Sequence, residues 1–367
     1  MRTRRAPILA LLTSLALALL VGPAGPTGDG AAAARADHPV QPVHADHCLI
    51  GASGARLGLL PADRADGASP AVGDALGDRQ RRRLEREIDR RLALLAQPSA
   101  GTSRSALMPL DSALDSALGS ALSQAGSTSD RSDVTVRVPV HAHVVDGTRD
   151  GDEAGPGRRR VERQLDVLNR AFAGDQSGAS PAAPFRFHLA SLERVVHDRW
   201  HRAAPDSRAE RRMKKSLTVG GLDELNLFFA EPRVRGGSIA LGSASFPWEA
   251  ERTPAADGVV VHTASMPGGD ARGYGRGDSA VHEVGHWLGL FHTFEGGCGG
   301  NGDMVDDTPS EGAPSFGCSK GQDSCPSAKG NDPVHNFMNY SPDRCMDRFT
   351  PDQVDRMSRV WLAYRAQ

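Results

Sequence analysis

The spacing of apolar and polar residues predicts a series of strands and helices in the second part of the chain. Val134–Val145 and Phe185–Val196 alternate apolar and polar residues, which is typical of half-buried strands. Val161–Phe172 repeats its apolar residues at helical spacing and is expected to back the sheet. We also expect a short helix at Glu210–Thr218, strands at Leu225–Phe229, Ser238–Phe246 and Val259–His262, and a closing helix at Gln353–Tyr364. Together these elements predict an α+β fold with a mixed sheet.

The preceding residues 37–131 differ in composition. They contain few aromatic residues and much alanine, arginine, aspartate, serine and glycine, so they cannot bury a large core. Asp78–Ala96 is predicted to be a helix whose interleaved acidic and basic residues favour a solvated face over membrane or nucleic-acid binding. Its apolar stripe consists of Leu84, Ile88, Leu92 and Leu95. Ser112–Leu122 repeats Ser-Ala-Leu and is interpreted as a weak helix in a protease-accessible linker.

Residues 1–36 have the three parts of a secretory signal peptide. Three arginines among the first five residues precede the apolar run Ile8–Val21, and Ala34-Arg35-Ala36 fits a cleavage site. This apolar run is short for a bilayer span, although an uncleaved anchor is the alternative. No second run of that length follows. We therefore expect a secreted protein without membrane contact after the signal is removed, and a folded domain at 132–367.

The length and the net charge of the chain indicate which kinds of partner it can bind. The chain has 367 residues, a formal net charge of −2 and a pI near 6.7. A nearly neutral chain is not expected to bind a polyanion, which excludes a nucleic-acid partner on bulk charge.

The candidate chemistry is concentrated in one stretch, V-H-E-V-G-H-W-L-G-L-F-H, which begins at residue 281. His282 and His286 are four residues apart, so on a helix both imidazoles project from one face and can bind one metal ion. Glu283 is placed to reach a water on that ion. Gly289 can end the helix through a positive φ angle, so that the chain turns back and His292 supplies a third nitrogen. Three nitrogens with an open fourth position are typical of a catalytic zinc.

This stretch has the H-E-x-x-H-x-x-G-x-x-H signature of metzincin metalloproteases, and a Met-turn sequence, N-F-M-N-Y-S-P, follows at Asn336–Pro342. With the segments H-T-F-E-G-G-C, D-T-P and F-T-P-D-Q-V-D-R-M, the chain resembles the pappalysin family, particularly its short bacterial members similar to ulilysin. The resemblance is dense from Leu217 to Met357. It implies a metzincin-type zincin fold, with a twisted mixed sheet, a backing helix and an active-site helix above the cleft, and a small irregular lower lobe with a C-terminal helix.

The resemblance also implies roles for further residues. Met338 is expected to form an apolar floor under the three histidines. Tyr340 would place its phenol near the metal, where it can donate to a developing oxyanion; the alternative is a core tyrosine. Asn339 stands where the family usually has aspartate. This departure leaves the three histidines and Glu283 unchanged. Ser238–Phe246 is expected to be the edge strand above the cleft, to which protein or peptide substrates add antiparallel.

The five cysteines divide into an isolated residue and a cluster of four. In a secreted chain, four clustered cysteines predict two disulfides in a loop-rich lobe, and a closed zinc site is disfavoured because no C-x-x-C pair occurs. Three connectivities are possible. The resemblance implies Cys298–Cys325 and Cys318–Cys345.

Cys48 lies outside this cluster of four, in residues 37–131, which we call the accessory segment. An unpaired fifth cysteine in that segment points to a latent precursor. A thiolate is a good zinc ligand and competes with the catalytic water. We expect Cys48 to occupy the zinc in a zymogen until cleavage of the linker, at Arg104 or Arg131, releases it. The alternatives are a spare thiol or an intermolecular bridge.

An acidic, glycine-containing loop follows the third histidine. Hard oxygen ligands in such a loop suit a structural Ca²⁺, which related enzymes bind in this region, although the spacing differs from that of an EF-hand. A solvated acidic loop is the alternative. The possible ligands are Asp303, Asp306, Asp307, Thr308 and Glu311.

The sequence therefore predicts a secreted zinc endopeptidase made as a precursor, with residues 37–131 as the pro-segment. Glu283 would be the general base toward a zinc-activated water. A catalytically silent extracellular binding or adhesion module on the same fold is the alternative. The presence of Glu283 argues against it, because such a scaffold needs the metal ligands but not the base. Hydrolysis of non-peptide amides is disfavoured by the Met-turn and the expected edge strand.

Overall fold

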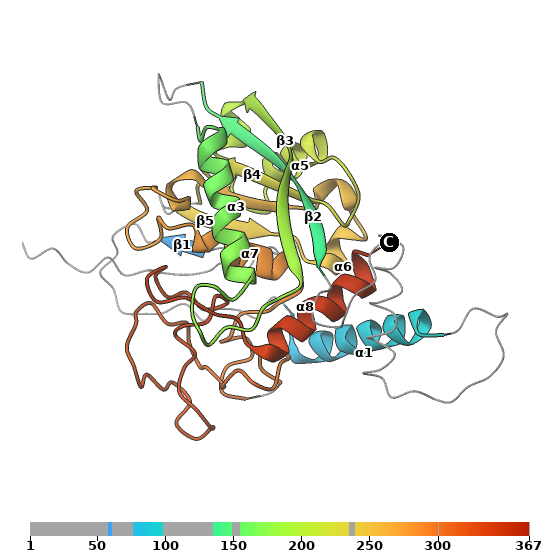
Figure 1. The fold of residues 1–367 in the computed structure, drawn as a ribbon, viewed down its shortest axis with the longest axis vertical. Coiled ribbons are helices and arrows are strands. Elements are labelled where there is room, and N and C mark those ends of the chain that lie inside the picture. The colour runs from blue at the N-terminus through green and yellow to red at the C-terminus, as the bar shows by residue number, and fades with distance from the viewer. Residues whose placement is uncertain are drawn as a thin grey trace, which may run out of the picture. The chain divides into compact units, whose positions relative to one another are not determined.

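The computed structural model describes residues 58–60, 76–97, 135–148, 155–234, 239–299 and 301–366 of the chain (Figure 1). The predicted signal peptide, Cys48 and the linker segment Ser112–Leu122 lie outside these residues, so they remain predictions. No helix within the described ranges is long and apolar enough to span a membrane.

A six-stranded mixed sheet forms the centre of the fold, as the alternating pattern predicted (Figure 1). Its strands are β1 (Gly58–Leu60), β2 (Val136–Asp146), β3 (Phe185–Val196), β4 (Leu225–Ala230), β5 (Ile239–Ala244) and β6 (Val259–His262). The spatial order is β1-β5-β6-β4-β2-β3. Strands β2, β3, β4 and β6 are parallel, whereas β5 runs antiparallel to both of its neighbours. This arrangement confirms the predicted α+β fold.

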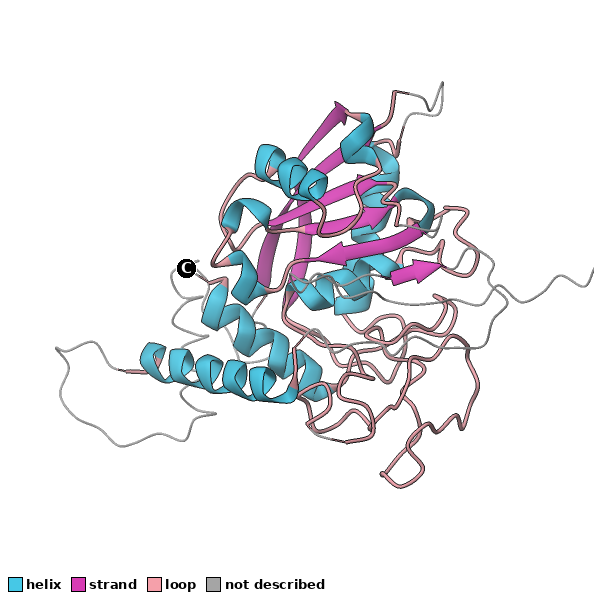
Figure 2. Cartoon of the chain, turned by 180° about the vertical axis from the view of Figure 1, so that it is seen from behind, coloured by secondary structure: helices cyan, strands magenta, loops and turns pink. Residues whose placement is uncertain are grey.

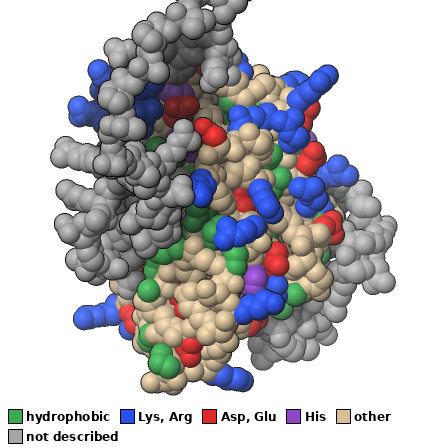
Figure 3. Space-filling view, turned by 90° about the vertical axis from the view of Figure 1, so that its left-hand side faces the viewer, with side chains coloured by type: hydrophobic (Ala, Val, Ile, Leu, Met, Phe, Trp, Pro, Cys, Tyr) green, Lys and Arg blue, Asp and Glu red, His purple; other side chains and the backbone are tan. Residues whose placement is uncertain are grey.

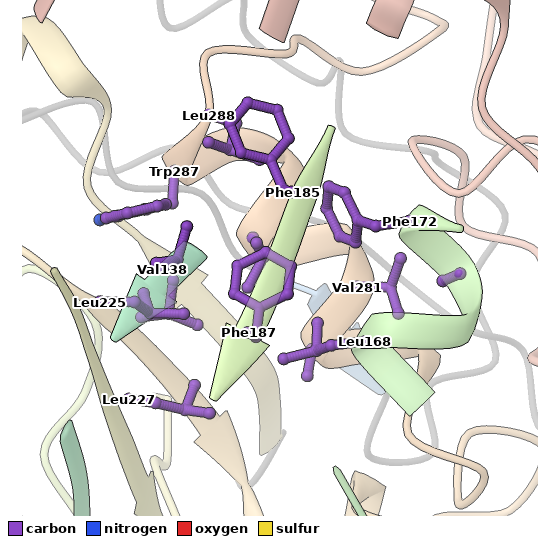
Figure 4. Packing of buried hydrophobic residues seen from close by; sticks show 14 of the residues in the cluster. Val138, Leu168, Phe172, Phe185, Phe187, Leu225, Leu227, Val281, Trp287 and Leu288 are labelled. Carbon is purple, nitrogen blue, oxygen red and sulfur yellow. The ribbon is translucent and has the colours of Figure 1, made fainter. Parts of the chain in front are cut away.

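Helices cover both faces of this sheet (Figures 1 and 2). They are α1 (Asp78–Leu95), α3 (Arg158–Phe172), α4 (Asp198–His201), α5 (Arg208–Leu217), α6 (Pro247–Ala250), α7 (Asp278–Trp287) and α8 (Pro351–Tyr364). On one face, Leu168 of α3 and Val281 of α7 join the main hydrophobic core together with Leu225 of β4 (Figure 4). On the other face, Met213 of α5 packs with Phe228 of β4. Alternate residues of β4 thus serve two separate cores, which is why that strand is apolar throughout.

Within residues 132–367, the predicted catalytic domain, β5 is the edge strand, as predicted for residues 238–246, and in the full-length chain β1 of the accessory segment pairs with its outer edge. The two strands pair antiparallel, with Gly58 opposite Gly242 and Leu60 opposite Ile239. An unpaired strand edge presents free N–H and C=O groups, and here a short stretch of the accessory segment satisfies them. β1 has 3 residues, too few for a recognisable period-two pattern.

α1 packs against the rest of the fold through its predicted apolar stripe (Figures 1 and 2). It lies beside α8, and Ile88 and Leu92 are buried in a cluster with aromatic residues of α6 and α8. An ion pair joins the two helices, with Glu85 Oε1 2.6 Å from Arg356 Nη1. Leu95 does not belong to the buried stripe, because it is 55% exposed. The accessory segment therefore covers an apolar surface of the C-terminal part of the chain.

The lower lobe follows α7 and precedes α8 in the sequence. Within the described residues it contains neither a helix nor a strand. Two disulfides, Cys298–Cys325 and Cys318–Cys345, cross-link it, which confirms the pairing that the resemblance implied. Cross-links of this kind restrict the unfolded chain and compensate for a small core. Met357 and Trp361 of α8 enter the main core and hold the C-terminal helix under α7.

Candidate active site

The first two histidines lie on α7, whose ten residues are all buried. The helix begins after Gly277, which has a φ of +102°. Val281 and Val284 point into the main core. His282 and His286 lie on the other side of the helix, since positions four apart share one face.

Gly289 ends this segment and turns the chain toward the third histidine. Its φ is +99°, a conformation that glycine adopts without steric strain. The Leu290 N–H donates to the Gly285 carbonyl at 2.9 Å and closes the turn. A Cβ at Gly289 would lie 2.6 Å from Cγ1 of Val360 in α8, so packing also requires glycine here. The turn brings His292 opposite the two helical histidines.

The three imidazole rings converge on one point. Nε2 of His286 lies 3.0 Å from Nε2 of His282 and 3.1 Å from Nε2 of His292. All three side chains are buried. In the part of the chain that the structure describes, this is the one group of three or more histidine, cysteine or carboxylate side chains close enough to hold a metal ion.

Backbone carbonyls orient the two helical rings toward that point. The Nδ1–H of His282 donates to Phe337 O at 2.7 Å, and the Nδ1–H of His286 donates to Leu290 O at 2.7 Å. These hydrogen bonds leave the Nε2 lone pairs of the two rings directed at each other. Lone pairs at such a separation repel unless a cation lies between them. The residues therefore fit a zinc ion with three nitrogen ligands.

Glu283 lies between the histidines and β5. Its side chain is 2% exposed, and a Cβ at Gly242 would lie only 2.6 Å from its Cγ. Glycine at position 242 thus allows the glutamate to lie against the backbone of this strand. Glu283 lines the same pocket as His282 and Tyr340. Its carboxylate therefore stands next to the metal position but outside the group of three ligands.

The Met-turn contributes two further side chains. The Tyr340 hydroxyl lies 3.0 Å from His292 Nε2, so the phenol reaches the metal position rather than only the core. Met338 is fully buried, and a Cβ at Gly285 would lie 2.5 Å from its sulfur. The thioether therefore packs directly against α7 at a residue between its two histidines.

A pocket opens beside Glu283 and Tyr340. Its walls come from β5, from the glycine-rich loop at residues 268–277, from the lower lobe and from the segment after the Met-turn. They include the apolar and aromatic side chains Leu241, Tyr274, Phe316 and Met346. A mainly apolar recess next to a predicted metal site can accept one apolar side chain of a ligand.

Glu311, which the sequence analysis named as a possible calcium ligand, lies in a buried hydrogen-bond network. This carboxylate is fully buried and accepts hydrogen bonds from the hydroxyls of Thr293 and Ser315, both at 2.7 Å, and from the Asn339 amide at 3.0 Å. It thus ties the residue after the third histidine to the Met-turn, and its burial raises its pKa to about 7. The amide of Asn339 donates to Glu311, whereas aspartate there would place two carboxylates together. Sequence analysis missed this network because its members are distant in sequence.

The other predicted calcium ligands do not share one hydrogen-bond network. The Thr308 hydroxyl donates to the Asp303 carboxylate at 2.7 Å, and Asp307 accepts from the Asp352 N–H at 2.8 Å. Asp306 is exposed. Among the described residues of this lobe, no three carboxylates converge.

Comparison with known proteins points to one class of enzyme. Residues 225–361 match the family described as pregnancy-associated plasma protein-A, peptidase M43. An extracellular metalloprotease of Colletotrichum graminicola is 41% identical over 235 residues, which are 63% of this chain and 78% of that protein. An extracellular metalloprotease of Arthroderma benhamiae is 38% identical over 245 residues, which are 65% of this chain and 77% of that protein.

Solved structures of mirolysin from Tannerella forsythia share the fold. Mature mirolysin in complex with a cleaved peptide is 28% identical, with a TM-score of 0.51 over 61% of this chain and 90% of mirolysin. A promirolysin mutant is 25% identical, with a TM-score of 0.53 over 69% of this chain and 89% of promirolysin.

The family match runs from β4 to α8, so it includes α7, the three histidines and the Met-turn. The fungal relatives are extracellular enzymes, which agrees with the secretion predicted from residues 1–36. The sequence motif, the geometry of the site and the relatives thus lead to one conclusion. The chain belongs to the pappalysin family of metzincins and is an extracellular metalloprotease.

Proposed function

We propose that the protein is a zinc-dependent endopeptidase that hydrolyses peptide bonds in proteins. The observation that carries this proposal is the convergence of three Nε2 atoms, at 3.0 and 3.1 Å, beside the buried carboxylate of Glu283. His282, His286 and His292 would hold the zinc ion. Zinc in this position supplies polarisation of a peptide carbonyl and lowers the pKa of water.

Glu283 acts in this proposal as general base and then as general acid. It lies between the metal position and the backbone of β5 at Gly242, where a peptide on that strand would pass. Its carboxylate accepts a proton from the attacking water and passes it to the leaving amine. The Tyr340 hydroxyl, 3.0 Å from His292 Nε2, donates a hydrogen bond to the carbonyl oxygen as that oxygen becomes negative.

Metal analysis and chelation test this proposal. The processed protein should contain about one zinc per chain and hydrolyse casein. Removal of the metal with 1,10-phenanthroline should abolish hydrolysis, and added zinc should restore it. Casein hydrolysis that persists in metal-free protein would contradict the proposal.

We further propose that the full-length chain is a latent zymogen, with the signal peptide at 1–36, the pro-segment at 37–131 and the catalytic domain at 132–367. β1 supports latency, because it occupies the edge of β5 that an extended substrate would use. Cys48 precedes β1 in the sequence and is proposed to bind the catalytic zinc through its thiolate.

Two variants of the full-length chain, with an uncleavable linker, separate these contributions. Cys48→Ala removes the thiolate, and Leu59→Pro removes a backbone N–H from β1. If the thiolate maintains latency, Cys48→Ala should hydrolyse peptides without any cleavage. If only Leu59→Pro is active, the strand blocks the cleft and Cys48 has no switching role. If both stay inactive while cleaved enzyme is active, neither contact maintains latency.

We also propose a structural calcium ion at residues 303–308. Asp303 supports this, because burial raises its pKa to about 7, and a bound divalent cation would keep such a carboxylate ionised. Removal of calcium with EGTA should lower the melting temperature, and CaCl₂ should restore it. A melting temperature that is the same with EGTA and with CaCl₂ would contradict the site.

A further inference from the structure

A pocket of basic side chains lies beside the active-site pocket. It has a volume of about 360 Å³ and is formed by the glycine-rich loop and the segment after the Met-turn. Three exposed arginines, Arg272, Arg276 and Arg344, line it together with one carboxylate, Asp270. Within the described part of the chain, their guanidinium groups take part in no ion pair. Figure 3 shows one face of the molecule, on which Lys and Arg side chains are spread among acidic ones.

The fold holds these arginines together. Asp343 donates its N–H to the Gly273 carbonyl at 2.9 Å, and its carboxylate accepts from the Arg276 N–H at 2.7 Å. These two hydrogen bonds fix the residue next to Arg344 against the loop. The loop is also closed on itself, because Gly268 N–H donates to the Gly275 carbonyl at 3.0 Å. The basic pocket is therefore a preformed part of the cleft wall.

The pairing of β1 with β5 shows the direction in which a peptide crosses the site. Gly58 stands opposite Gly242, the residue against which Glu283 packs, and Leu60 stands opposite Ile239. An antiparallel peptide whose scissile bond lies near Glu283 therefore continues, after that bond, along the start of β5.

The start of β5 leads to the basic pocket. Leu241 packs with Ala271 and Tyr274 of the glycine-rich loop, and Ile239 packs against the same cluster. Ala271 also lines the basic pocket. At about 3.3 Å per residue, a peptide reaches this region about two to four residues beyond the scissile bond.

We propose that Arg272, Arg276 and Arg344 form a subsite for an aspartate or glutamate side chain on the C-terminal side of the cleaved bond. This inference rests on the proposed endopeptidase function. Guanidinium groups bind carboxylates through paired hydrogen bonds as well as charge, and three of them outweigh the single negative charge of Asp270.

Matched peptides test the subsite on activated enzyme prepared from the full-length chain. The peptides share a sequence that the enzyme cleaves at one bond, identified by mass spectrometry, and are amidated so that only a side chain supplies a carboxylate. They differ at the third residue after that bond, which is Asp, Asn or Lys. Because exposed ion pairs are weak, kcat/KM should be about three- to tenfold higher with Asp than with Asn, and lowest with Lys. The preference should decrease with added NaCl.

Variants assign the preference to these arginines. Arg276→Gln/Arg344→Gln should bring the Asp-to-Asn ratio close to one, and its cleavage of the Asn peptide at the same bond shows that the variant folds. Arg212→Gln, an exposed arginine of α5 on the other face of the sheet, should keep the wild-type ratio. Equal rates for Asp and Asn in active wild-type enzyme, or an unchanged ratio in the double variant, would overturn the inference. Failure to cleave any peptide would instead contradict the proposed function and, with it, the subsite.

Discussion

Gly289→Ala should destabilise the protein and displace the third zinc ligand. The residue has a φ of +99°, and a left-handed conformation costs a residue with a side chain about 1–2 kcal/mol. In addition, the new Cβ would lie 2.6 Å from Cγ1 of Val360, and overpacking of this kind costs about 1–3 kcal/mol. The two contributions predict a loss of about 2–5 kcal/mol in the free energy of unfolding. Relief of the clash would shift the turn that delivers His292, so zinc affinity should fall as well.

Gly321→Ala is the matched control. Gly321 has a φ of +80°, but a Cβ there would meet no atom within 4 Å. It should therefore show only the conformational cost, about 1–2 kcal/mol, with unchanged zinc affinity. Urea unfolding and a competition assay with a chromogenic zinc chelator measure both quantities for the two variants. Equal destabilisation by both substitutions, with wild-type zinc affinity in Gly289→Ala, would refute the assigned role of this turn.

Three further predictions follow from other contacts of the site and the fold. Tyr340→Phe should retain zinc and lower kcat about 10²–10³-fold with little change in KM, because the phenol acts on the oxyanion; an unchanged kcat would make it a core residue. Burial and the negative charge of Asp278 raise the pKa of Asp343 to about 7, so this carboxyl stabilises the fold at acid pH, and its contribution is lost as the pH rises from about 4 to 7. Asp343→Asn should therefore be more stable relative to wild type at pH 8 than at pH 5 in urea unfolding, and a pH-independent difference would contradict this. Ile88→Ala should lower the stability of the full-length chain by about 2–4 kcal/mol because Ile88 is 1% exposed, and a loss below about 1 kcal/mol would show that α1 is not firmly packed.

Short-range patterns were sufficient to predict the metal ligands and most of the fold. His282 and His286 share a helix face, and the turn at Gly289 requires only local backbone geometry, so the stretch from His282 to His292 contains this information. The strand at Phe185–Val196 was also predicted with its observed bounds, from the alternation of Phe185, Phe187 and Leu189 with polar residues.

Contacts between distant segments could not be predicted in the same way. β1 lies on β5 because an open strand edge accepts any extended segment, and nothing in its 3 residues indicates that pairing. The ion pair between Glu85 and Arg356 joins residues 271 apart, so the sequence predicted the apolar stripe of α1 but not the helix against which it packs. The contacts of Glu311 with Thr293 and Asn339 could not be predicted for the same reason, because these residues are distant in sequence.

Glu283→Gln tests the central claim most directly, because it removes the base and keeps the shape of the side chain and all three histidines. The measurement is zinc content together with the rate of casein hydrolysis by the processed enzyme, with Glu162→Gln, an exposed glutamate of α3, as the control. We expect Glu283→Gln to bind about one zinc per chain and to hydrolyse casein about 10²–10⁴-fold more slowly, while Glu162→Gln matches the wild type. A zinc-loaded Glu283→Gln enzyme that hydrolyses casein at the wild-type rate would contradict the account.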